Sequence, residues 1–255
     1  MSKLIRFGRR YFAAAAGAAY AFTLGLRNAR HRSLLQQIAT HFGHDDYPDR
    51  ALPGVAADAV TSWSTDVALP EPEGRDGNVS LLELLVLARI VRERRPASLF
   101  EIGTFDGRTT LALAANAPND AVVYTLDLPA GTPTELSIVE SERQYVEKAA
   151  SGARLRGYPA ALGKVRQLYG DSATFDFAPY AAQFVFVDAS HAYEYVLKDS
   201  ESALRLVGDT RGVILWHDYG AWDGVTRALD ELYMRDPRFK DLHVISGTTL
   251  AILEH

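Results

Sequence analysis

The chain has 255 residues, of which 47% are hydrophobic and 23% charged, as in a globular protein with one sizeable core and an appendage. It contains no cysteine, which excludes disulfide bonds and cysteine-ligated metals and fits the reducing cytoplasm, where we expect the protein to reside. Residues 1–32 carry seven bases and no acid, so the remainder carries 20 bases against 32 acids. This acidic body argues against nucleic acid as a partner, because phosphate binding needs a basic surface.

Residues 1–32 are predicted to form a basic, apolar helix. Its apolar run, Tyr11–Leu26, has 16 residues and falls just short of the ~18–20 residues that span a bilayer. The letters RRYF at its start resemble a twin-arginine export signal, but cleavage after Ala21 would leave too short an apolar region. Three interpretations stay open: a helix lying on an anionic membrane surface, a signal or anchor, or a helix packed on the protein body or on a second subunit of a homodimer.

Residues 33–79 are predicted to form a cap and linker ahead of the main domain. The Pro/Gly/acidic cluster Pro70–Gly77 is typical of an exposed linker. Directly after it, Ser80-Leu81-Leu82-Glu83 is a capping box, which predicts a helix that ends before Pro96. We therefore place the start of the main domain at residue 80 and let it run to residue 255.

From residue 97 onward, short apolar strands alternate with stretches long enough for helices. The strands read SLFEI, AVVYTLD, FVFVD and GVILWHD, a pattern that predicts an α/β fold with a parallel sheet and crossover helices. The closing sequence HVISGTTLAILE predicts two short strands joined in a hairpin. Within residues 129–168, ELSIVESERQYVEKAA predicts a helical segment that covers the substrate.

The turn after the first strand, residues 101–107, reads EIGTFDG. Glycines at such a turn let backbone approach a ligand, and the following helix offers free N–H groups, although a tight turn without a ligand is the alternative. A dinucleotide-binding turn requires a second glycine where Phe105 stands, and Glu101 would repel a pyrophosphate. The turn therefore favours a cationic nucleoside cofactor over NAD.

Acidic residues follow the other strands as well. They are Asp127, Asp171 in GDS, Asp188 and Asp218. A single acid at a strand end is usually a solvated loop residue, but ligands of open α/β sheets bind at the carboxyl ends of the strands. The recurrence therefore predicts one shared site, in which Asp127 accepts hydrogen bonds from ribose hydroxyls and Asp171 with Ser172 contacts an adenine edge.

In chain order, EIGTFDGRTT, TLD, GDS, FVFVDASHAYEYVLKD and GVILWHDY resemble the motifs of class I S-adenosylmethionine-dependent methyltransferases. The branch they resemble contains the bacterial macrocin-type O-methyltransferases and cephalosporin-hydroxylase-like proteins, and the resemblance runs from about residue 80 to residue 255. It implies a Rossmann-like three-layer sandwich whose seven-stranded, mostly parallel sheet has an antiparallel last strand. It also implies methylation of a hydroxyl group on a small-molecule acceptor.

The resemblance also assigns cofactor roles. It places Glu101 against the methionine ammonium group, Gly103 beneath the cofactor and Asp127 on the ribose. The full predicted S-adenosylmethionine site is Glu101, Gly103, Thr104, Phe105, Gly107, Asp127, Asp171, Ser172 and Asp188.

A divalent cation and a catalytic base follow from the same resemblance. Macrocin-type relatives bind the cation through three acids; Asp188 and Asp218 match two of them, and His217 stands at the third. This set can hold Mn²⁺ or Fe²⁺, whereas Mg²⁺ prefers oxygen ligands, although His217 as a packing or outer-shell residue is the alternative. The branch's base position is occupied by Ser190, so we expect His191 to be the general base.

Three other functions remain open at this point. The protein could be a non-catalytic relative that acts as a membrane-associated scaffold. It could be a hydroxylase-like member of the same branch, or an NAD-dependent or nucleotide-sugar enzyme on a similar sheet.

Overall fold

The structure, a computed structural model, describes residues 3–28, 31–32, 35, 50–159, 163–209 and 211–254. The chain divides into two compact units, Met1–Pro48 and Asp49–His255. The second unit thus begins ahead of the predicted boundary at residue 80. Of the predicted cap at 33–79, residues 33–34 and 36–49 lie outside the described residues.

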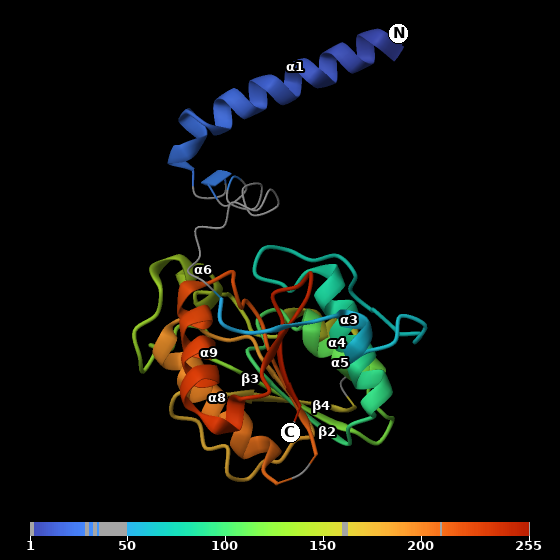
Figure 1. The fold of residues 1–255 in the computed structure, drawn as a ribbon, viewed down its shortest axis with the longest axis vertical. Coiled ribbons are helices and arrows are strands. Elements are labelled where there is room, and N and C mark those ends of the chain that lie inside the picture. The colour runs from blue at the N-terminus through green and yellow to red at the C-terminus, as the bar shows by residue number, and fades with distance from the viewer. Residues whose placement is uncertain are drawn as a thin grey trace. The chain divides into compact units, whose positions relative to one another are not determined.

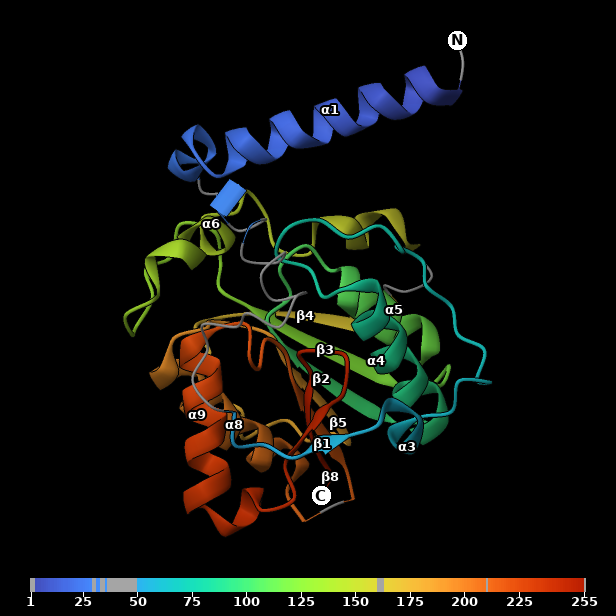
Figure 2. The ribbon, with the colours of Figure 1, turned by 45° about the horizontal axis from the view of Figure 1, so that its top comes forward.

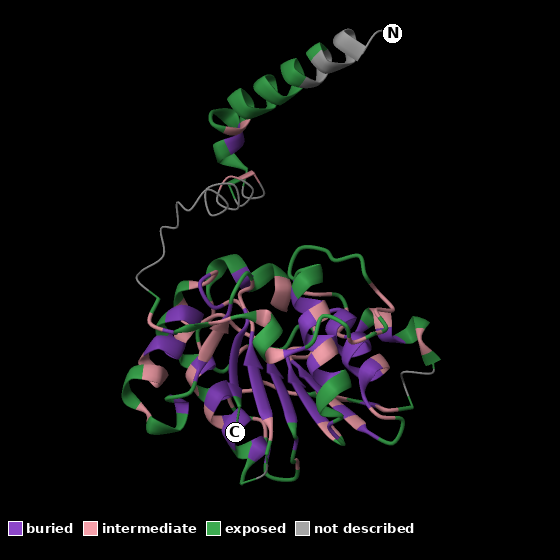
Figure 3. Ribbon diagram, turned by 45° about the vertical axis from the view of Figure 1, so that its right-hand side comes forward, coloured by how far each residue is buried: buried purple, intermediate pink, exposed green. Residues whose placement is uncertain are grey.

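The first unit contains helix α1 (Lys3–Ala21) and the 3₁₀ helix η1 (Leu24–Arg27). Tyr11 and Phe12 of α1 are 71% and 75% exposed, and every residue from Tyr11 to Tyr20 is exposed (Figure 3). None of the helices among the described residues is long and apolar enough to cross a membrane.

The second unit is built on one sheet in the order β1-β7-β8-β6-β5-β2-β3-β4. The strands are β1 (Gly54–Val55), β2 (Ser98–Ile102), β3 (Val122–Asp127), β4 (Val165–Tyr169), β5 (Phe184–Val187), β6 (Val213–Trp216), β7 (His243–Ile245) and β8 (Ala251–Glu254). All pairings are parallel except those of β8, which runs antiparallel to both β6 and β7. The mostly parallel sheet and the antiparallel last strand are confirmed.

The sheet has eight strands, and the predicted count of seven is wrong. The additional strand is β1, which pairs through Gly54 and Val55 with β7. Two residues are too few to show the alternation by which a strand is recognised in sequence, so β1 is defined only by its long-range pairing.

Helices cover both faces of the sheet and complete three layers (Figures 1 and 2). The helices are α3 (Ala57–Val60), α4 (Leu81–Arg94), α5 (Arg108–Asn116), α6 (Arg143–Val146), α8 (Tyr193–Val207) and α9 (Asp223–Arg235). Side chains alternate across each strand, so Phe184 and Phe186 pack with α4 and α5, whereas Val185 and Val187 pack with α8 and α9. This confirms the Rossmann-like α/β sandwich.

The capping box of α4 forms as the sequence predicts. Ser80 accepts a hydrogen bond from the Glu83 amide, and the Glu83 carboxylate accepts one from the Ser80 amide. The helix ends at Arg94, and Arg95 adopts the left-handed conformation before Pro96.

The predicted helix between residues 135 and 150 is largely absent. Only the 3₁₀ turn η2 (Glu140–Glu142) and the single turn α6 form there, followed by η3 (Ala153–Gly157). In this segment, tertiary contacts of Glu142 and Lys148 prevail over helix propensity.

Candidate functional site

The switch point of the sheet lies between β2 and β5. The chain moves outward from β2 through β3 to β4 and then returns to β5 and β6 on the other side of β2. The chain therefore leaves β2 and β5 toward opposite sides of the sheet, and ligands of open α/β sheets bind at the carboxyl ends of the strands near such a switch point. Most of the predicted site residues lie in these loops or in those after β3 and β6.

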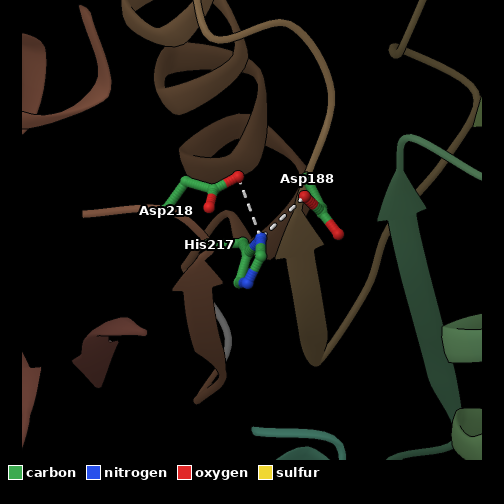
Figure 4. A group of neighbouring side chains, drawn as sticks. All are labelled: Asp188, His217 and Asp218. Atoms are coloured by element: carbon green, nitrogen blue, oxygen red, sulfur yellow. Dashed lines mark hydrogen bonds and ion pairs between the residues drawn. The ribbon is translucent and has the colours of Figure 1, made fainter. Parts of the chain in front are cut away.

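Asp188, His217 and Asp218 come together at the ends of β5 and β6 (Figure 4). His217 Nδ1 lies 3.1 Å from Asp188 Oδ1 and 3.0 Å from Asp218 Oδ2. One ligand atom from each residue can be chosen so that all three lie within 4.8 Å of one another. Two carboxylates and one imidazole nitrogen at these separations form a donor set suited to a divalent cation.

The backbone and the charges of this cluster are unusual. Asp218 has φ +68°, a left-handed conformation that aspartate tolerates and that is common at functional turns. Burial opposes a charged imidazole, but Asp218 and Asp188 outweigh it and raise the pKa of His217 well above its ordinary value. Burial likewise opposes the charge of Asp218, yet His217 and His191 hold its pKa far below the usual range.

The second ring nitrogen of His217 contacts Glu83, a residue that the sequence indicated only as a helix cap. His217 Nε2 lies 3.3 Å from Glu83 Oε2, and the Glu83 side chain is 5% exposed. Thr249 donates to Glu83 Oε1 through both its amide, at 2.7 Å, and its hydroxyl, at 2.8 Å.

His191 is held between two carboxylates. Its Nδ1 lies 2.7 Å from Glu142 Oε2, and its Nε2 lies 2.9 Å from Asp218 Oδ2. Trp222 stacks on the ring at 4.1 Å with an interplanar angle of 8°. Burial lowers the proton affinity of the imidazole, but Asp218 and Glu142 raise the pKa of His191 to about 9, so the neutral imidazole that the sequence predicts is not the state in this arrangement.

Glu142 is a second site residue that the sequence did not indicate. Its carboxylate is 2% exposed and accepts hydrogen bonds from the His191 amide and the Ser190 hydroxyl. Ser190 therefore donates a hydrogen bond to the same carboxylate that contacts His191. No local pattern identifies such a residue in the sequence.

The glycine turn after β2 passes close to the end of β5. Gly103 has φ +105°, and a Cβ on it would lie 1.9 Å from the carbonyl oxygen of Asp188. Gly107, at φ +90°, precedes α5, and Phe105 is also left-handed at φ +48°. Thr104 is buried, and its hydroxyl lies 2.6 Å from that of Thr125.

Glu101 lies beneath this turn and is fully buried. Its Oε2 accepts hydrogen bonds from the Thr110 and Thr125 hydroxyls, whereas Oε1 has no partner among the described residues. Burial, with smaller contributions from Asp188 and Asp127, raises the pKa of Glu101 to about 8. With this pKa, Glu101 is a neutral acid at pH 7. The predicted role of Glu101 as counter-ion of an ammonium group requires the ionised carboxylate.

Asp127 ends β3 and is paired with Lys148. Lys148 Nζ lies 3.0 Å from Asp127 Oδ1, and the side chains are 11% and 8% exposed. Asp127 Oδ2 is buried without a partner among the described residues, so one oxygen of the carboxylate is free to accept a hydrogen bond.

Asp171 lies after β4 and is already engaged within the chain. It accepts hydrogen bonds from the Tyr195 hydroxyl at 2.6 Å and from the amides of Glu135 and Ala173. Ser172 lies near the buried Asp199 of α8. The structure thus brings Asp188, His191, His217 and Asp218 into one cluster, whereas Asp171 bonds to Tyr195 of α8 and to the amides of Glu135 and Ala173.

Residues 100–219 match a family model described as a methyltransferase domain, a span slightly under half of the chain that runs from β2 to the loop after β6. No curated protein matches the chain.

The chain is also similar to solved structures. It is 22% identical to the O-methyltransferase TomG from Streptomyces achromogenes in complex with SAM, with 70% of this chain and 82% of that chain covered and a TM-score of 0.49. It is 19% identical to an O-methyltransferase from Bacillus cereus in complex with SAH, with 73% and 84% covered and a TM-score of 0.46. The methyltransferase PaMTH1 of Podospora anserina is 18% identical, with 69% and 79% covered and a TM-score of 0.48.

Proposed function

We propose that the protein is an S-adenosylmethionine-dependent methyltransferase that methylates a hydroxyl group of a small molecule. One observation carries the proposal: the glycine turn after β2 meets the Asp188–His217–Asp218 cluster at the switch point, with the Asp188 carbonyl in the space that a Gly103 side chain would fill. Methyl transfer requires a cofactor turn, a proton acceptor and an acceptor hydroxyl at one place. The family model that matches residues 100–219 supports the same function.

The residues that would hold the cofactor fit it at two points. Asp127 Oδ2 is a buried oxygen without a partner among the described residues, placed to accept a ribose hydroxyl. Gly103, without a side chain, lets the turn after β2 lie directly against the Asp188 carbonyl at the end of β5. S-adenosylmethionine would supply the methyl group.

Asp188, His217 and Asp218 would hold a divalent cation. Such a cation would lower the pKa of the acceptor hydroxyl and orient it. The nitrogen of His217 makes the set more suitable for Mn²⁺ than for Mg²⁺, which prefers oxygen ligands.

His191 would accept the proton that the acceptor hydroxyl loses when its oxygen forms the bond to the methyl carbon. Both ring nitrogens face carboxylates, Nδ1 that of Glu142 and Nε2 that of Asp218, so His191 would serve as the base through Nε2 once a cation drew the Asp218 carboxylate away from it. Trp222 fixes the plane of the ring by stacking on it. The two contacts leave the imidazole little rotational freedom.

Cofactor binding is tested first. S-adenosylmethionine should raise the melting temperature of the protein and NAD should not, because a ligand stabilises the state it binds. Transfer is then measured with methyl-labelled S-adenosylmethionine and a panel of hydroxylated small molecules. Binding without transfer to any acceptor would favour a non-catalytic relative, and stabilisation by NAD would favour the other cofactor class.

The metal and the base are tested once an acceptor is found. Chelation should suppress turnover, and Mn²⁺ should restore it better than Mg²⁺. His191→Ala should lower kcat by roughly 10²- to 10⁴-fold with cofactor affinity unchanged. His243→Ala, a change to a histidine in β7, is the matched control and should leave kcat unchanged. Full activity after chelation would refute the metal, and full activity of His191→Ala would refute the base.

A further inference from the structure

We propose that Glu83 is a positioning residue for the candidate metal site, in which it fixes the ring orientation and tautomer of His217. This inference rests on the metal site of the proposed function. The sequence explains Glu83 completely as the last residue of a four-residue capping box, so nothing in the local pattern calls for a second role.

The two nitrogens of His217 face different groups. Nδ1 lies at 3.1 and 3.0 Å from carboxylate oxygens of Asp188 and Asp218, and Nε2 lies at 3.3 Å from Glu83 Oε2. An Nε2–H that donates to Glu83 leaves Nδ1 as the nitrogen directed at the two acids (Figure 4). A histidine that ligates a metal almost always donates its other ring N–H to a carboxylate or carbonyl, which fixes the tautomer and increases its basicity.

Glu83 is itself held too firmly to be a flexible partner. Oε1 accepts two hydrogen bonds from Thr249, and Oε2 accepts one from the Ser80 amide at 2.7 Å as well as contacting His217. Thr249 also accepts a hydrogen bond from the Asp218 amide at 3.3 Å. The buried Glu83 carboxylate thus contacts the start of α4, the turn before β8 and His217. Through Thr249 it is also linked to the Asp218 amide.

A capping role alone does not account for this arrangement. A capping box needs the Ser80 hydroxyl, the Glu83 amide, the Glu83 carboxylate and the Ser80 amide, and nothing more. An exposed carboxylate would serve it equally well, whereas this side chain is 5% exposed. Burial of a carboxylate is unfavourable unless it is fully hydrogen-bonded, and here the additional partners are His217 of the candidate metal site and Thr249, whose hydroxyl accepts a hydrogen bond from the Asp218 amide.

The test is a calorimetric titration of the full chain with Mn²⁺, performed on the wild type and two variants. Glu83→Gln keeps the size of the side chain but removes the charge that aligns His217, and it should weaken Mn²⁺ binding by roughly 10- to 100-fold. Ser80→Ala is the matched control, because it removes the hydroxyl half of the cap and leaves the contacts of the Glu83 carboxylate with the Ser80 amide, Thr249 and His217 in place. It should lower the melting temperature and leave the Mn²⁺ affinity within about twofold of the wild type, since the cap bond stabilises only the helix.

Each outcome supports or refutes the positioning role of Glu83. Wild-type affinity in Glu83→Gln, or an equal loss of affinity in Ser80→Ala, would overturn the positioning role while the metal site of the proposed function stood. Failure of the wild type to bind Mn²⁺ would refute the metal site and this inference with it, but not the cofactor site around Asp127. If Glu83→Gln does not fold, Thr249→Val removes one anchor of Glu83, and it should show a smaller loss of the same sign; unchanged affinity there would refute the role.

Discussion

The free oxygen of Asp127 leads to a measurable prediction about the cofactor. In Asp127→Asn the side chain keeps its shape but loses the charge that its partners complement. Oδ1 is engaged by Lys148 at 3.0 Å and by the Leu128 amide at 3.1 Å, so Oδ2 is the oxygen left for a ligand hydroxyl. A hydrogen bond to a charged group contributes about 1.5–3 kcal/mol, which predicts a loss of S-adenosylmethionine affinity of about 10- to 150-fold.

The assay is isothermal titration of each variant with S-adenosylmethionine. Asp120→Asn is the matched control, because Asp120 is exposed near the opposite end of β3 and the net charge changes equally. Its affinity should equal that of the wild type. Affinity within twofold of the wild type in Asp127→Asn would remove Asp127 from the site, and equal losses in both variants would show that net charge, not a ribose contact, governs binding.

Three further predictions concern stability and the N-terminal unit. Burial raises the pKa of Asp199 from 3.8 to about 7, so the folded state binds an additional proton between these values and stability falls as pH rises through them. Asp199→Asn should remove this fall, worth up to about 3 kcal/mol between pH 5 and pH 8, in urea unfolding at these two pH values, and parallel pH profiles would contradict the assignment. Gly103→Ala should lower the melting temperature by several degrees or prevent folding, because its Cβ would overlap the Asp188 carbonyl; an unchanged melting temperature would refute that contact. Deletion of residues 1–48 should leave S-adenosylmethionine binding intact and abolish salt-sensitive sedimentation with anionic vesicles, whereas a change in oligomeric state instead would favour a subunit contact.

The sequence predicts those parts of the fold that local patterns determine. The strands β2, β3, β5 and β6 are largely apolar runs bounded by turns, and the start of α4 is defined by a four-residue box. Because parallel strands that end at one edge bring their following residues together, the convergence of Asp188, His217 and Asp218 could be expected without coordinates. These features depend on neighbours along the chain or on sheet topology.

The remainder depends on contacts between distant segments. His217 and Glu83 are 134 residues apart, and His191 and Glu142 are 49 apart, so no motif spacing relates them. The 135–150 segment has a helical composition, but Glu142 and Lys148 contact His191 and Asp127. The backbone therefore forms only short turns there. The raised pKa of Glu101 could not be predicted from the sequence either, because it depends on complete burial of the side chain beneath the turn.

The Thr249 contact has a consequence for how the site is assembled during synthesis. Glu83 emerges from the ribosome early, but its two hydrogen bonds to Thr249 join it to a residue 166 positions later. Domains emerge N-terminus first, so a nascent chain that stops before β8 carries every strand-end motif and yet lacks the anchor of Glu83. The candidate metal site can then acquire its final geometry only after the turn before β8 has been made, and a chain that stalls at residue 240 should be unable to hold His217 in its final orientation.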